Sequence, residues 1–284
     1  MRTSIILFFM GGLLLSGYAQ IELPSLSPEA EFRQTVGYTN FTVKYGRPSV
    51  RGRTIMGDLV PFGKLWRTGG GPPSIINFDR DVVIGDKTVV AGSYILVTIP
   101  GEQTWTVMLN ANTSRLIVLD EEYDIATETA RVVIESKPFP FLETFTIIPE
   151  IAGNSLYLIL SWENTSVRIE IKTLTNEHVE QQIAALTDES NNHESLGATA
   201  YYFLRTGQQH ERALKMVNQA IKLRKEPWYL ETRMKLFAAM GNYPEANKAM
   251  ENAVKFLQET KPNYWEGYVE SLRAEAASWK SSQQ

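Results

Sequence analysis

The chain has 284 residues, a formal net charge of −4 and no cysteine. The lack of cysteine excludes disulfides, thiolate metal sites and cysteine nucleophiles. The slightly acidic balance lacks the basic footprint that a nucleic-acid-binding domain needs, and the length suffices for two hydrophobic cores. We therefore expect two domains and no nucleic acid among the partners.

The first residues predict a secretory signal. Met1 and Arg2 give a basic start, the run from Ile5 to Leu15 is apolar apart from two glycines, and Ala19 stands at a suitable cleavage position. A membrane anchor is the alternative, but the run is shorter than the roughly 20 residues that span a bilayer. We predict that residues 1–19 are removed and that the protein is exported to the periplasm or the cell exterior, with no transmembrane segment left.

A period of two dominates the chain from Phe32 to Thr175, and we assign residues 20–175 to a β-domain. Trp105, Val107 and Leu109 occupy alternate positions, as in half-buried strands of antiparallel sheets. Turn signals divide the segment into about nine or ten strands. These signals are Gly37–Asn40, Gly85–Lys87, Pro100–Glu102, Pro138–Pro140, Gly153–Asn154 and Glu163–Asn164. We predict an antiparallel β-sandwich of jelly-roll-like type, with Trp105 and Trp162 in its core.

One segment of the β-domain interrupts this pattern. From Tyr45 to Gly71 it reads YGRPSVRGRTIMGDLVPFGKLWRTGGG, which is too irregular for a strand and too polar for a core. Guanidinium groups bind carboxylates and phosphates through paired hydrogen bonds, and binding groups often lie on loops. We predict that this loop binds an anionic small molecule or a glycan. The candidate binding residues are Arg47, Arg51, Arg53, Trp66 and Arg67.

A structural role for these arginines is the alternative. They could pair with Asp58, Asp79 or Asp81 and fix the long loop to the sheet, because arginine–carboxylate pairs commonly do so. Aromatic side chains could instead form a stacking platform for a sugar ring. Its candidate members are Tyr45, Phe62 and Trp66, with Tyr94 or Trp105.

Signals for catalysis are weak in this sequence. The three histidines lie outside the β-domain and lack the spacing of a zinc-protease helix, and no nucleophile-elbow motif occurs. We expect no metal and no cofactor. The alternative to a binding protein is a hydrolase of envelope glycans or peptides, with carboxylates such as Asp58 or Glu143 as acid and base.

A helical period begins near Glu177. Apolar residues then recur at steps of three and four, as at Ala213 and Val217. We assign residues 176–284 to a helical domain whose last helix runs from Tyr264 to Lys280.

The helical domain contains an internal repeat. Gly207 and Gly241 each follow a helical run and are 34 residues apart, while Ala213 and Ala246 are 33 apart. The pattern resembles the tetratricopeptide repeat over roughly residues 195–260. This resemblance implies a groove that docks a peptide or protein, and an ordinary helix bundle is the alternative.

The β-domain resembles an exported bacterial family known as domain of unknown function (DUF) 2911. The resemblance covers about residues 28–172. Its matching runs are GRPSVRGRTIMGDLVPFGKLWRTG from Gly46, AGSYILVTIPG from Ala91, WTVMLN from Trp105 and SLYLILSWENTSVRIEI from Ser155. The family implies an exported β-domain and supplies no catalytic residues. After Gly69 its members commonly continue with Ala-Asn-Glu, whereas Gly70, Gly71 and Pro72 stand here.

Overall fold

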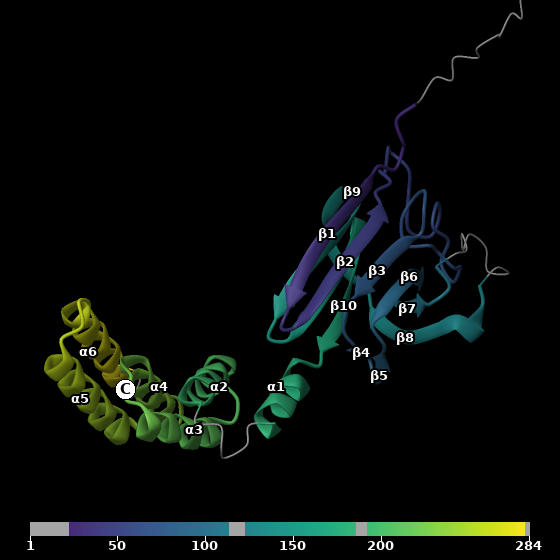
Figure 1. The fold of residues 1–284 in the computed structure, drawn as a ribbon. Helices are drawn as coiled ribbons and strands as arrows, with labels where there is room; N and C mark the ends of the chain where they lie inside the picture. The colour runs from purple at the N-terminus through teal and green to yellow at the C-terminus, as the bar shows by residue number, and fades with distance from the viewer. Residues whose placement is uncertain (1–22, 114–122, 186–191, 282–284) are drawn as a thin grey trace, which may run out of the picture. The chain divides into compact units, whose positions relative to one another are not determined.

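The computed structural model describes residues 23–113, 123–185 and 192–281 (Figure 1). The chain divides into two compact units, Met1–Thr173 and Leu174–Gln284. The described part of the first unit is built almost entirely from strands and loops, and that of the second from helices. The change from a period of two to a helical period therefore predicted the architecture correctly. Within the described residues, no helix is both long and apolar enough to cross a bilayer.

Two antiparallel sheets form the first unit. The first sheet has the strand order β1 (Glu29–Val36), β2 (Thr39–Gly46), β3 (Ser74–Phe78), β6 (Gly92–Ile99), β7 (Thr104–Asn110) and β8 (Glu128–Glu135). The second has the order β5 (Lys87–Val89), β4 (Val82–Ile84), β10 (Ser155–Thr173) and β9 (Lys137–Ala152). Chain neighbours are mostly sheet neighbours, joined at tight turns where Gly37, Gly85 and Gly153 have φ values of 56°, 63° and 59°.

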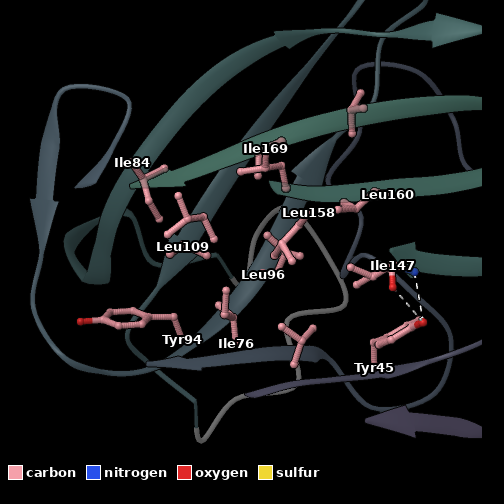
Figure 2. Packing of buried hydrophobic residues seen from close by; sticks show 14 of the residues in the cluster. Tyr45, Ile76, Ile84, Tyr94, Leu96, Leu109, Ile147, Leu158, Leu160 and Ile169 are labelled. Carbon is pink, nitrogen blue, oxygen red and sulfur yellow. Dashed lines mark hydrogen bonds between the residues drawn. The ribbon is translucent and has the colours of Figure 1, made fainter. Parts of the chain in front are cut away.

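The two sheets share one hydrophobic core. Figure 2 shows Leu158 of β10 close to Ile76 and Leu96 of the first sheet. Trp105 and Trp162 belong to the same core, with 1% and 2% of their surface exposed. The alternating apolar positions of the sequence thus point into a common interior, which confirms the prediction for both tryptophans.

Two predicted turns are parts of strands. Pro138 and Pro140 lie within β9, which is the edge of its sheet and therefore needs no backbone donor on its free side. Glu163 and Asn164 lie within β10. The β9–β10 register shifts on both sides of Glu163, whose φ is 54°, so this position is a β-bulge. The turn residues mark an edge and a bulge rather than chain reversals.

Six helices form the described part of the second unit. They are α1 (Thr175–Ala184), α2 (His193–Thr206), α3 (His210–Leu223), α4 (Pro227–Ala239), α5 (Tyr243–Thr260) and α6 (Trp265–Ser281). Gly207 ends α2 with a φ of 69°, and Gly241, with a φ of 73°, follows α4, as expected of left-handed stops. The equivalent alanines Ala213 and Ala246 are fully buried, because small residues let paired helices approach closely.

Candidate functional site

The loop that carries the arginines bridges the two sheets; we call residues 47–71 the arginine loop. At its start, Val50 N donates to Glu143 O at 2.7 Å and Phe145 N donates to Pro48 O at 2.9 Å, so the loop pairs with β9. Near its end, Trp66 and Thr98 exchange backbone hydrogen bonds of 2.7 and 2.9 Å, so the loop pairs with β6. Both ends are therefore fixed to regular strands, which suits a binding loop.

Glycines allow the two ends of the loop to touch. A Cβ on Gly46 would lie 1.8 Å from the carbonyl oxygen of Gly70, and a Cβ on Gly70 would lie 2.5 Å from Ser27 Oγ. Gly69 has a φ of 146°, which side chains rarely permit. Alanine at position 70 would therefore force Ser27 to move.

Two carboxylates hold the middle of the arginine loop through its backbone. Glu143 of β9 accepts from Arg51 N at 2.9 Å, and Arg51 has a φ of 49°. Glu163 accepts from the backbone N–H groups of Ile55 and Met56 at 3.3 and 3.4 Å. The bulge at Glu163 aims this carboxylate at the loop. Acidic residues thus fix the loop without neutralising its guanidinium groups by direct contact.

Three arginines line one open pocket, which we call the arginine pocket. They are Arg51, Arg53 and Arg67. The pocket encloses about 400 Å³, within the roughly 300–1,000 Å³ typical of small-molecule sites. Its remaining lining residues are Leu26, Ser27, Pro48, Ser49, Leu59, Leu65, Trp66, Gly69, Gly70 and Trp162. No aspartate or glutamate is among the described residues that line it.

The three arginines differ in what their side chains contact. Arg51 Nη2 donates to Leu26 O at 2.9 Å. Arg53 donates through Nε to Val50 O at 3.0 Å and through Nη2 to Ser49 O at 2.6 Å. The guanidinium of Arg67 makes no hydrogen bond or ion pair within the described part of the chain. The side-chain hydrogen bonds of Arg51 and Arg53 all go to neutral carbonyl groups, so among the described residues none of the three guanidinium groups is paired with an acid.

Arg47 is the one predicted arginine outside the lining. Its Nε donates to Phe145 O at 3.3 Å and its Nη2 to Thr146 Oγ1 at 3.0 Å. Both acceptors lie on β9. Arg47 therefore joins the loop to the second sheet, and we assign it a structural role.

Trp66 forms one wall of the arginine pocket from within an aromatic cluster. Its ring lies 6.0 Å from that of Trp105, 5.1 Å from Phe145 and 5.9 Å from Trp162, centre to centre. Its Nε1 donates to Gly69 O at 3.2 Å, which links the indole to the backbone next to Arg67. Trp66 is half-buried and leaves part of its ring for a ligand.

The predicted stacking platform is wrong for most of its members. Tyr45, Tyr94 and Trp105 are buried in the core, because they lie on the inward positions of β2, β6 and β7. Phe62 is exposed but is not part of the pocket lining. Of the platform, only Trp66 lines the pocket, and Trp162, predicted as a core residue alone, is its second indole.

The predicted carboxylate partners of the arginines have other roles. Asp79 accepts two hydrogen bonds from Asn40, of 2.8 and 2.7 Å, and Asp81 accepts from Ala91 N at 2.8 Å. Asp58 is exposed and lies outside the pocket lining. Glu143 holds Arg51 N instead of facing the pocket as an acid or base. The lining therefore does not present the pair of carboxylates that glycoside hydrolysis requires.

Backbone strain is concentrated beside Arg67. Thr68 is fully buried yet has a φ of 59°, and its hydroxyl donates to Thr98 Oγ1 at 3.1 Å. Ser74 Oγ donates to the carbonyl of Thr68. A left-handed threonine is costly and is kept only where its surroundings fix it. The residue that directly follows Arg67 is thereby held in place.

The sequence did not predict that residues near the N-terminus form part of the arginine pocket. Leu26 and Ser27 line the pocket although they precede β1. Arg51 and Gly70 hold them there, through a hydrogen bond and close packing. Nothing in the local sequence marks this role, because it depends on contacts between segments about 25 to 45 residues apart.

A second pocket, of about 320 Å³, lies in the helical unit. We call it the helical groove; it is lined by Tyr201, Leu204 and Arg205 of α2, Lys235 and Ala238 of α4, and Glu275 of α6. Lys235 bridges Glu231 and Glu275 at 2.7 and 3.2 Å. Burial lowers the pKa of Lys235, but these two ion pairs outweigh burial and the net shift is upward. The helical groove is thus lined by α2, α4 and α6, and the ion pair between Lys235 and Glu275 links α4 to α6.

Comparison with known proteins identifies the β unit. The family model described as "Protein of unknown function (DUF2911)" matches residues 27–171, just over half of the chain. Neither the curated proteins nor the solved structures contain a match to this chain. The matched region includes both sheets and the whole arginine loop. The chain therefore belongs to the DUF2911 family.

Proposed function

We propose that this protein is an exported, non-enzymatic binding protein whose β unit holds an anionic small molecule or an acidic glycan in the arginine pocket. One observation carries the proposal: Arg51, Arg53 and Arg67 line the pocket, and the described lining residues include no acid. Unpaired guanidinium groups on one concave surface attract anions and bind them through charge-assisted hydrogen bonds. The half-buried Trp66 and the leucines of the lining supply apolar contact for the rest of the ligand.

Isothermal titration calorimetry at low salt tests this function. The probes are benzoate and phenyl phosphate, with neutral benzyl alcohol of similar size as the control. The proposal predicts that at least one anion binds the full chain, that added salt weakens its binding, and that benzyl alcohol binds more weakly. Binding of benzyl alcohol alone, or of none of the three, would contradict an anion site.

For the helical unit we propose tetratricopeptide-like repeats that dock a peptide or protein. Three features support this: the repeat spacing, the matching glycines after α2 and α4, and a groove lined by α2, α4 and α6. A photoreactive residue placed at Tyr201, inside the groove, should crosslink to a partner in cells. The same group at Lys248, an exposed residue of α5 outside the lining, should not. Equal crosslinking at both sites would contradict a groove-specific partner.

Export is proposed from Arg2, the run from Ile5 to Leu15, and Ala19, which lie outside the described residues. Mass spectrometry of the mature protein should find its N-terminus at or near Gln20, and an intact Met1 would contradict cleavage. For the β unit we propose a sandwich with jelly-roll-like passages where the chain moves between the sheets, at β3–β4, β5–β6 and β8–β9. An experimental structure checks these passages directly.

A further inference from the structure

We propose that the arginine pocket is specific for a doubly charged anion, a phosphate monoester whose phosphate carries a cyclic or otherwise apolar body. This inference rests on the proposed anion-binding function and narrows it to one chemical class. It follows from the number of charges in the lining, the hydrogen-bond donors that remain free, and the apolar surface beside them.

The charge of the lining favours a dianion. Arg51, Arg53 and Arg67 contribute three fixed positive charges. Glu143 and Glu163 accept hydrogen bonds from backbone N–H groups of the arginine loop. Neither residue lines the pocket. A monoanion would leave most of the positive charge uncompensated, whereas a phosphate monoester carries a charge of about −1.5 to −2 near neutral pH.

The free donors also fit a phosphate. Arg67 keeps its whole guanidinium fork, while Arg51 and Arg53 each spend only one or two nitrogen donors on carbonyl oxygens. Those carbonyl contacts hold the two side chains in place and leave further N–H groups available. Together the three arginines have enough N–H donors for the three terminal oxygens of a phosphate, whereas a carboxylate offers only two oxygens.

The apolar part of the lining accommodates the body of the ester. Trp66 and Trp162 stack with an angle of 18° between their planes, and both line the pocket. Leu26, Leu59 and Leu65 line it as well. Surface of this kind gives no advantage to inorganic phosphate, so the ester should bind more tightly than the free ion.

Calorimetric titration of the full chain with four probes tests the inference. Phenyl phosphate carries the proposed charge and body. Benzenesulfonate has three terminal oxygens but a single charge, benzoate has two oxygens, and inorganic phosphate lacks the ring. At slightly alkaline pH, where the ester is dianionic because its second pKa is about 6, we expect phenyl phosphate to bind roughly tenfold or more tightly than each of the others.

Variants connect the binding to the named side chains. Arg67→Ala should weaken phenyl phosphate by roughly tenfold or more, and Arg67→Lys should recover only part of the loss because it keeps the charge without the fork. Arg33→Ala is the matched control, since Arg33 is an exposed arginine of β1 outside the lining. It should leave the affinity unchanged.

The outcomes separate this inference from the proposed function. If benzoate or benzenesulfonate binds as tightly as phenyl phosphate, the pocket binds anions but is not selective for a dianion, and the inference is wrong. If inorganic phosphate matches the ester, the role of the apolar wall is wrong. If no anion binds, or if Arg67→Ala and Arg33→Ala behave alike, the anion site itself is contradicted.

Discussion

At the scale of residues, the backbones of Gly46 and Gly70 come into close contact beside the arginine pocket. Gly46 ends β2, and a Cβ there would collide with the carbonyl oxygen of Gly70, while a Cβ on Gly70 would meet the side chain of Ser27. Gly70, Ser27 and Arg67 all line the arginine pocket. The glycines of this loop therefore set the shape of the pocket, although none of them supplies a charge.

Replacement of Gly46 by alanine tests this contact. The new Cβ would overlap the carbonyl oxygen of Gly70, so we expect a loss of roughly 1–3 kcal/mol in the free energy of unfolding and weaker anion binding. Gly267→Ala in α6 is the control: a Cβ there meets no atom, and alanine favours helix, so stability should stay equal or rise by about 1 kcal/mol. Chemical denaturation of both variants measures the difference. A Gly46→Ala protein as stable as the wild type would contradict the contact.

At the scale of elements, the sequence predicted the presence of strands better than the residues at which they begin and end. The alternation of Leu156, Leu158, Leu160 and Trp162 correctly indicated a strand. The turn residues at Glu163 suggested that it ends there, whereas β10 continues through a bulge to Thr173. A bulge and a turn use the same residues with positive φ, and only the pairing partner distinguishes them. The carboxylate that this bulge aims at the arginine loop was therefore missed as well.

Docking of α1 onto α2 and α3 depends on a carboxylate whose effect should vary with pH. Val179 and Ile183 pack into the same core as Phe203. Hydrogen bonds from Gln209 and Arg212, of 2.7 and 2.6 Å, lower the pKa of Glu180 below its ordinary value. A carboxylate whose pKa is depressed by folding stabilises the folded state at pH values above its unfolded pKa. That stabilisation is lost as pH falls through the folded pKa.

Glu180→Gln tests the pH dependence. The pair is solvent-exposed, so at neutral pH the variant should lose less than about 1 kcal/mol of helical-unit stability. The gap should close at a pH well below about 4.3, where Glu180 of the wild type is also protonated. Denaturation followed by far-ultraviolet circular dichroism at both pH values measures it. Glu259→Gln, in a more exposed pair with Lys255, is the control and should show no such gap. A gap that persists in acid would contradict the role of the charge.

At the scale of the whole molecule, the two units have separate cores. The apolar clusters of the β unit include no residue beyond Ile171, and those of the helical unit begin at Val179, within the described residues. The sequence indicated this division because the hydrophobic period changes there. Three of the four arginines that it singled out, Arg51, Arg53 and Arg67, line one pocket, and Arg47 does not. The complete lining of the arginine pocket could not be predicted. It combines Leu26, the arginine loop and Trp162, which are far apart in the sequence and meet only in the folded chain.

Separate cores predict that the helical unit folds alone. A fragment from Leu174 to Gln284 should give a helical circular-dichroism spectrum and a cooperative melt, because its buried side chains contact one another. The β unit up to Thr173, without the helices, is the companion fragment and should retain binding of phenyl phosphate. Aggregation or disorder of the helical fragment would mean that its helices need the sheets as a wall.

We propose that the side chain of Arg67 serves a ligand and not the fold, and a thermal melt of the Arg67→Ala protein is the decisive measurement. The side chain has no partner within the described residues, so its loss should change stability by no more than about 0.5 kcal/mol, or roughly 1–2 °C. Phenyl phosphate should raise the melting temperature of the wild type clearly more than that of the variant. A drop of many degrees without ligand, or an undiminished rise with it, would contradict the account.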